Sequence, residues 1–410
     1  MYHDHHFHPF GYTALVNGLD LMDAPDLEAA MAMVAGRASA VDGPIVGQRM
    51  NDEGLAELRL PTAEEIDGVV SDRPVLLYRY CGHIAVANSK AMKLAGVDAD
   101  TPDPKGGSYD RDARGSPNGI LRETAIKKVS AALAPLIPAP SDHQTLDALA
   151  GLRKVGLASI TGIISADDPV WCGTGDEIDT LARIAPRLPI GIDVLVIAKS
   201  PASLAATKSR LEKAEGPIRF LGWKDFADGS LGGHTAAMHE PFSDNPSTRG
   251  TDRLDRSKAL VMAETSLELG GSVAIHAIGD RANDEVLDLF EHLIGRGASP
   301  DSLRIEHASI LTGKAVERMA RLGVTASVQP AFLASEFDWL EKRLGPKRLL
   351  DAYPFRSMTE AGIRLLGGSD TPVEGPDPTI GILAAVNRHG INTEESLTQA
   401  QAEAMFAPSV

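Results

Sequence analysis

Cysteines, long apolar runs and basic clusters are scarce in this sequence, and each shortage excludes a class of protein. Cys81 and Cys172 are the only two cysteines among 410 residues, which is too few for a disulfide framework. No apolar run approaches the ~20 residues that cross a membrane, and no secretion signal opens the chain. We therefore expect a cytoplasmic protein with no membrane partner.

Positive charge is also in short supply. The 40 Lys and Arg residues face 56 Asp and Glu residues, which gives a formal net charge of -16. Nucleic acids and anionic lipid surfaces both favour a basic face on their partner. The charge balance therefore predicts no nucleic-acid partner, although it says little about the substrate.

The sequence does contain a regular alternation of short apolar runs and helical patterns after Ser141. Such alternation is typical of a parallel sheet with helices between its strands. The expected helix 281–295, for example, places Val286, Phe290, Leu293 and Ile294 on one face. Seven strands are expected, at 157–165, 190–197, 218–226, 272–279, 303–309, 324–330 and 363–369.

Residues 9–140 differ from the rest because proline and glycine interrupt them often. We expect an irregular region there, with two or three short helices, of which 26–40 is the clearest, and a strand at 74–80. Segment 101–119 is rich in turn-forming residues, so we expect a long loop.

The first residues are rich in histidine, with His3, His5, His6 and His8 around Asp4. Side chains two residues apart on a β-strand point the same way, so His6 and His8 can present two imidazoles to one metal ion. A purification-tag remnant or a frayed polar terminus is the plain alternative.

Adding this polar strand brings the count to eight, the number in a (β/α)8 TIM barrel. We expect an α/β protein with residues 1–8 as strand one, residues 9–140 as an inserted cap or substrate region, and residues 141–410 as the rest of the barrel. Catalytic groups of such barrels lie at the carboxyl ends of the strands.

Four further candidates fall at those strand ends, namely Lys224, His276, His307 and Asp370. Each alone has an ordinary explanation, such as a structural histidine, an ion-paired lysine or a helix-capping aspartate. Together with the histidine pair of strand one, they place six candidates at one end of five strands. This convergence predicts a metal site.

The motifs around these residues resemble the amidohydrolase superfamily of metal-dependent hydrolases. The closer resemblance is to amidohydrolase family 3, which includes YtcJ-like proteins and N-substituted formamide deformylases. It is carried by Gly82-His83, Asn88-Ser89, Asp228-Gly229-Ser230, His276-Ala277-Ile278-Gly279-Asp280-Arg281-Ala282 and Gly368-Ser369-Asp370-Thr371-Pro372-Val373. The resemblance implies hydrolysis of C–N bonds other than peptide bonds, and we expect a homodimer.

The resemblance also implies a role for each metal-site residue. His6 and His8 would hold one divalent ion, His276 and His307 a second, and Lys224, converted to a carbamate by carbon dioxide, would bridge the two. Asp370 would bind metal and act as general base and then acid. Zinc is the expected ion, although iron, manganese or nickel suits the same donors.

Four residues are weaker candidates for substrate contacts. His83 would donate a hydrogen bond to the substrate carbonyl or oxyanion, unless it is a structural loop residue. Arg79 and Arg281 would bind a substrate carboxylate, with ordinary salt bridges as the alternative. Glu123 would face the pocket or replace Lys224 as the bridge, although a structural role or one supporting the ligands is favoured.

The chain departs from the family pattern in two places. A small β-sandwich, built from segments before strand one and after the barrel, is expected to be largely absent. In addition, the end of the second strand, Ile163-Ile164-Ser165-Ala166-Asp167, stands where relatives commonly carry a His-Asp pair.

These patterns predict an amidohydrolase that acts on an amide, N-formyl or N-acyl group of a small-molecule substrate through a metal-activated hydroxide. Hydrolysis of an ester, a lactone or a cyclic amide on the same site is one alternative, since a fold does not fix the substrate. A degenerate barrel that binds a ligand without turnover is another.

Overall fold

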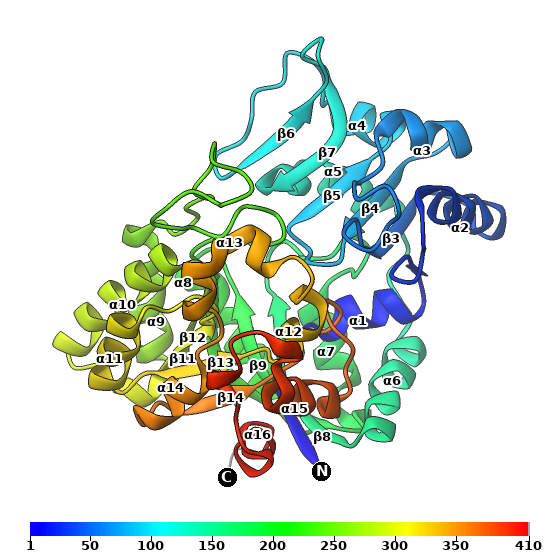
Figure 1. The fold of residues 1–410 in the computed structure, drawn as a ribbon. Helices are drawn as coiled ribbons and strands as arrows, with labels where there is room; N and C mark the ends of the chain where they lie inside the picture. The colour runs from blue at the N-terminus through cyan, green and yellow to red at the C-terminus, as the bar shows by residue number, and fades with distance from the viewer. Residues whose placement is uncertain (409–410) are drawn as a thin grey trace. The chain divides into compact units, whose positions relative to one another are not determined.

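The structure is a computed structural model that describes residues 1–408. Figure 1 shows the course of the chain, which folds into two compact units. The barrel unit comprises Met1–Pro9, Leu149–Asp167 and the described chain from Glu177 onward. The insertion unit comprises Phe10–Ala148 and Asp168–Asp176.

Eight parallel strands form the barrel unit, which confirms the expected α/β barrel with an insertion after strand one. In spatial order they are β1 (Tyr2–Phe7), β8 (Leu157–Ser165), β9 (Gly191–Ile197), β10 (Ile218–Phe226), β11 (Ser272–Ala277), β12 (Leu303–His307), β13 (Thr325–Val328) and β14 (Leu365–Gly367). The first and last strands meet where Asp370 N donates to His6 O at 2.8 Å and His8 N donates to Thr371 O at 2.8 Å. The barrel is therefore nearly closed.

Helices follow most of these strands and lie around the barrel (Figure 1). Helix α10 buries Val286, Phe290 and Leu293 of the predicted face, whereas Ile294 is only partly buried. Among the described residues, no helix combines the length and the apolar character that crossing a bilayer requires. The helices of this part of the chain are α7 (Glu177–Ile184), α8 (Pro201–Lys213), α9 (Arg256–Glu268), α10 (Asp280–Gly295), α11 (Gly313–Leu322), α12 (Phe332–Glu336), α13 (Leu340–Arg348), α14 (Phe355–Glu360), α15 (Pro378–Asn387) and α16 (Gln399–Met405).

The polar first strand is a buried part of the barrel, so it is not a frayed terminus. The ring nitrogens of His3 contact Ser159 Oγ at 2.7 Å and Thr161 Oγ1 at 2.9 Å. The Asp4 carboxylate accepts from Ser369 Oγ at 2.6 Å. Because buried polar groups need partners, these bonds explain how a strand of histidines replaces an apolar one.

The insertion unit contains a six-stranded sheet. The sequence predicted only the strand at 74–80 and otherwise an irregular region, so most of these strands were not expected. Its core strand β4 is buried on both faces, with Val75 and Leu77 in one apolar cluster and Leu76 and Tyr78 in the other. The spatial order is β2 (Leu19–Asp20), β3 (Ile45–Met50), β4 (Val75–Arg79), β5 (Ile84–Ala87), β7 (Pro117–Glu123) and β6 (Gly107–Arg111). The helices are α1 (Pro9–Val16), α2 (Leu27–Ala40), α3 (Ala63–Val69), α4 (Ser89–Leu94), α5 (Thr124–Leu133) and, leading back to the barrel, α6 (Asp142–Gly151).

The expected long loop at 101–119 is wrong, because much of it belongs to the antiparallel hairpin β6–β7. Tyr109 pairs with Leu121 in this hairpin, and Arg122 binds Asp110 across the strands at 2.7 Å. The hairpin carries few apolar residues and adds to the sheet through β5. Its strands thus depend on pairing with a distant segment, which local turn propensity does not reveal.

Candidate metal centre

Three buried side chains converge where β1 and β14 end. His6 is the last but one residue of β1, His8 directly follows that strand, and Asp370 follows β14. The Nε2 atoms of His6 and His8 lie 3.3 and 3.2 Å from Asp370 Oδ1. The candidate ligand atoms of the three residues all lie within 4.8 Å of one another. Two imidazoles and one carboxylate at this spacing form a donor set that suits a divalent ion.

Glu306 fixes the orientation of one of these imidazoles. Its Oε2 lies 2.5 Å from His6 Nδ1, and Arg304 Nε donates to its Oε1 at 2.5 Å. Although burial alone would raise the pKa of Glu306, Arg304 and His6 hold it well below its usual value. The resulting carboxylate accepts a hydrogen bond from His6 Nδ1–H, which leaves Nε2 facing Asp370. Although burial alone would lower the pKa of His6, Asp370 and Glu306 raise it above its ordinary value, so a metal ion at Nε2 would displace a proton.

The charge states of His8 and Asp370 also fit metal ligands. Burial lowers the pKa of His8, so its imidazole is neutral. Burial would raise the pKa of Asp370, but the imidazoles of His6 and His8 hold it well below its usual range. Metal binding requires a neutral imidazole and an ionised carboxylate, because a proton and a cation compete for the same lone pair.

His276 and His307, at the ends of β11 and β12, lie next to the first pair. The ring centroid of His307 is 4.8 Å from that of His6 and 4.4 Å from that of His276. His276 Nε2 contacts Gly229 O at 2.9 Å and Asp228 Oδ1 at 3.2 Å. These two acceptors place the proton on Nε2 and leave the lone pair of His276 on Nδ1.

His307 has a buried nitrogen that no residue of the described chain satisfies. Its Nδ1 has no hydrogen-bond partner among residues 1–408. Burial lowers the pKa of this imidazole far below its ordinary value, so the ring is neutral and one nitrogen carries a lone pair. An unsatisfied buried nitrogen is costly, and a metal ion at this position would satisfy it.

The backbone at the site is in an unusual conformation. His307 and Asp370 have φ values of +73° and +60°, in the left-handed region that residues with a Cβ rarely adopt. Strain of this kind clusters at functional sites. At these two residues the backbone therefore no longer follows the regular alternation of side chains along a strand.

Lys224, on β10, is buried in the barrel unit, with only 1% of its surface exposed. Its Nζ donates to Asp225 O at 3.1 Å and lies 3.8 Å from the centre of the Phe226 ring. Burial lowers the pKa of Lys224 to about 8, although Glu306 and Asp370 oppose this shift. A neutral amine is the form that reacts with carbon dioxide.

The weaker candidates form contacts of their own within each unit. In the insertion unit, His83 Nδ1 contacts Glu123 Oε2 at 3.0 Å, and Arg79 Nε donates to Asp52 Oδ1 at 2.6 Å. In the barrel unit, Arg281 forms ion pairs with Asp252 and, at 3.6 Å, Glu285. The substrate-binding roles of His83, Glu123, Arg79 and Arg281 stay predictions.

Sequence reasoning missed Glu306, Arg304 and Asp228. Arg304 and Glu306 carry opposite charges at alternate positions of β12 just before His307. This pattern could have indicated their role from the sequence. Asp228 accepts bonds from Ile278 N at 3.0 Å and Gly279 N at 2.8 Å. These bonds fix the turn after β11, and the motif Asp-Gly-Ser alone does not indicate this role.

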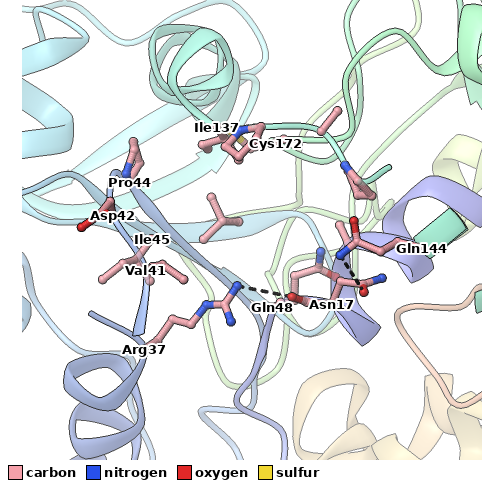
Figure 2. A pocket seen from close by; sticks show the side chains of 17 residues that line it. Asn17, Arg37, Val41, Asp42, Pro44, Ile45, Gln48, Ile137, Gln144 and Cys172 are labelled. Carbon is pink, nitrogen blue, oxygen red and sulfur yellow. Dashed lines mark hydrogen bonds between the residues drawn. The ribbon is translucent and has the colours of Figure 1, made fainter. Parts of the chain in front are cut away.

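The insertion unit has its own cavity, which the predicted site residues do not line. Figure 2 shows Arg37 and Gln144 reaching Asn17 from separate elements, with Arg37 Nη2 3.3 Å from Asn17 O and Gln144 Nε2 3.1 Å from Asn17 Oδ1. The cavity of about 290 Å³ also borders Cys172. It is therefore a feature distinct from the metal cluster.

Comparisons with known proteins agree with this architecture. Residues 3–407 match the sequence profile of the Amidohydrolase family. The Bacillus subtilis (strain 168) protein named "Putative amidohydrolase YtcJ" is 32% identical over 408 residues, covering 98% of this chain and 75% of that protein. The N-substituted formamide deformylase of Arthrobacter pascens is 27% identical over 368 residues, covering 86% of this chain and 66% of that protein.

The fold is likewise that of a solved relative. A crystal structure described as an uncharacterized metal-dependent hydrolase from Pyrococcus horikoshii OT3 matches with a TM-score of 0.75 and 29% identity. The match covers 98% of this chain and 78% of that one. With the profile match and the relatives above, the chain belongs to the amidohydrolase family, and within it to the YtcJ-like family 3 proteins.

Proposed function

We propose that this chain is a metal-dependent amidohydrolase that cleaves a non-peptide C–N bond in an amide, N-formyl or N-acyl group of a small molecule. The observation that carries the proposal is the convergence of His6 Nε2 and His8 Nε2 on Asp370 Oδ1, at 3.3 and 3.2 Å. The name of the deformylase relative indicates an N-substituted formamide as its substrate, and this supports the choice of substrate class.

The donor set fits divalent ions, with zinc as the first choice. His6, His8 and Asp370 would hold one ion, and His276 and His307 a second. Lys224 would contribute as a carbamate, because a free ammonium would repel a cation. When bound, such ions lower the pKa of water and polarise a carbonyl group.

Asp370 is the residue placed to move the proton. Because the neighbouring imidazoles keep its pKa low, it is a carboxylate that can accept the proton of the attacking water. The same oxygen can then give that proton to the leaving nitrogen, which must be protonated before it departs as an amine. Glu306 keeps His6 in place throughout, so the residue beside Asp370 does not rotate.

The experiment is a hydrolysis screen of the zinc-loaded protein with N-benzylformamide, N-benzylacetamide and the corresponding benzyl esters. We expect release of benzylamine from at least one amide. Asp370→Asn should reduce kcat by about 10²- to 10⁴-fold, the range for loss of a general acid-base group.

Asp377→Asn is the matched control, since Asp377 caps α15 through Thr379 N at 2.9 Å. This control should retain activity. Turnover of the esters without any turnover of the amides would replace the proposal with an esterase. Full activity in Asp370→Asn would contradict the role given to this residue.

A further inference from the structure

Gln329 is a buried amide for which the described protein supplies no partner. It follows β13 directly and is 1% exposed. Neither its Oε1 nor its Nε2 has a hydrogen-bond partner among residues 1–408. A primary amide has two donor hydrogens and an acceptor oxygen, and burying both ends unsatisfied is costly. Such a group needs a partner from outside the chain.

The strand register places this amide on the inner face of the barrel. His276 pairs with Glu306, and Glu306 pairs with Ser327. Glu306 points inward, because it contacts His6, which lies on a strand that is not its neighbour. Paired residues of parallel strands face the same side, and residues two apart share a face, so Gln329 follows Ser327 on the inner face.

Along the barrel axis, Gln329 lies at the level where such barrels bind substrates. Ser327 lies level with Glu306 and His276, so Gln329 is one inward position nearer the carboxyl end, where barrels bind substrates. Its own backbone is tied to the site, since Gln329 O accepts from Phe332 N at 3.1 Å. The Phe332 ring stacks on His307, with centroids 6.0 Å apart and planes at 12°.

We propose that Gln329 binds the substrate's amide group, with Nε2 donating to its carbonyl oxygen and Oε1 accepting from its N–H. This inference rests on the proposed function and narrows it. The substrate would carry an N–H beside a carbonyl, as in a secondary amide, a formamide, a urea or a lactam. Esters and tertiary amides would leave Oε1 unpaired, and a site built to bind an N–H discriminates strongly against analogues that lack it.

The kinetic test compares N-benzylformamide with N-benzyl-N-methylformamide. The two substrates differ only in whether the amide nitrogen carries a hydrogen or a methyl group. The parent should have a kcat/KM at least about tenfold higher for the N–H substrate. Gln329→Met, which keeps the length of the side chain but removes its hydrogen-bonding groups, should abolish this preference. Thr325→Val is the matched control, since Thr325 lies on the same face of β13 nearer its amino end, and it should keep the preference.

A binding test gives an answer that does not depend on turnover. The probes are N-benzylurea and its fully N-methylated counterpart, measured by calorimetry on the zinc-loaded parent and on both variants. The parent should bind N-benzylurea about tenfold more tightly or better, and only Gln329→Met should lose this difference.

The outcomes separate the two proposals. No amide turnover, together with N–H discrimination in binding that Gln329→Met removes, would reject the hydrolase and retain the amide-binding site. Amide turnover with the same N–H preference in the parent and in Gln329→Met would overturn the inference and leave the hydrolase standing. Equal binding of both ureas by the parent would also overturn it.

Discussion

Glu306 Oε2 lies 2.5 Å from His6 Nδ1, although the two residues are 300 positions apart in the chain. This contact points the opposite nitrogen of His6 toward Asp370, 3.3 Å away. Neither residue is exposed by more than 1%, so water does not compete for the bond. The orientation of a candidate metal ligand is therefore set by a carboxylate on another strand.

Replacement of that carboxylate should weaken metal binding. Glu306→Gln keeps the shape of the side chain but removes the charge that holds the Nδ1 proton of His6 and pairs with Arg304. Loss of such a supporting group typically costs about 10- to 100-fold in metal affinity. A zinc titration against a competing chelator measures the change.

Glu291→Gln is the control for this charge change, because Glu291 forms an exposed ion pair with Arg318. It should leave zinc affinity unchanged. If Glu306→Gln bound zinc as tightly as the parent, the carboxylate would not be a supporting group.

Removal of metal should lower the melting temperature of the parent. A ligand that binds only the folded state stabilises it by RT ln(1 + [L]/Kd), or about 2.7 kcal/mol at a concentration 100 times Kd. We expect zinc to raise Tm in chelator-treated protein, and His307→Ala to reduce the rise because the unpartnered Nδ1 is gone.

His292→Ala is a suitable comparison, since His292 lies on α10 away from the cluster of strand-end histidines. Differential scanning calorimetry of the parent and both variants, with and without zinc, gives the six melting curves. An equal zinc shift in His307→Ala and the parent would remove His307 from the ligand set.

Carboxylation of Lys224 should depend on pH. Its pKa is lowered to about 8, so about one tenth of the amines are neutral at pH 7 and about nine tenths at pH 9, whereas an ordinary lysine with a pKa near 10.4 stays charged. At a fixed concentration of dissolved carbon dioxide, a carbamate signal from ¹³C-labelled bicarbonate should rise across this interval.

Carbon NMR of Lys224→Gln and Lys208→Gln assigns that signal. Lys208 pairs with Glu212 on α8, and its replacement should leave the signal in place. A carbamate resonance that persists in Lys224→Gln would show that another amine is modified.

The two cysteines should react at different rates. Burial raises the pKa of the Cys172 thiol to about 12, so at pH 8 it stays protonated, and the thiolate is the reactive form. Cys81 is only partly buried. With an aromatic disulfide reagent, folded Cys81→Ser should show almost no rapid reaction, whereas Cys172→Ser should keep it.

Denaturant provides the internal reference for this measurement, because both single-cysteine variants should react fully once unfolded. Rapid modification of folded Cys81→Ser would mean that the Cys172 thiol is accessible and ionised. The cavity that Cys172 borders would then be open to the reagent.

The sequence by itself determined the barrel and the chemical types in its site. Apolar runs separated by helical patterns have a clear period, and Lys224, His276 and His307 each follow such a run. The carboxyl ends of parallel strands meet at one end of a barrel. Strand order alone was therefore enough to predict that these residues would lie together.

Only the tertiary structure decided how those residues are held. The pairing of Glu306 with His6, the unpartnered nitrogen of His307 and the isolation of the Gln329 amide are relations between segments that barrel closure brings together. These relations cannot be inferred from the residues next to each position in the sequence. The polar strand β1 was ambiguous for the same reason, because Ser159 and Thr161 of β8 satisfy His3, and Glu306 of β12 satisfies His6 Nδ1.

The insertion shows the same limit in its backbone. The strand β4 was predicted because apolar residues cover both its faces, a pattern visible within five residues. The hairpin β6–β7 was not, since Tyr109 and Leu121 are its few fully buried apolar residues and its strands exist by pairing with each other and with β5. The burial pattern of a single strand can be inferred from its own residues, whereas strand pairing depends on which distant segments meet.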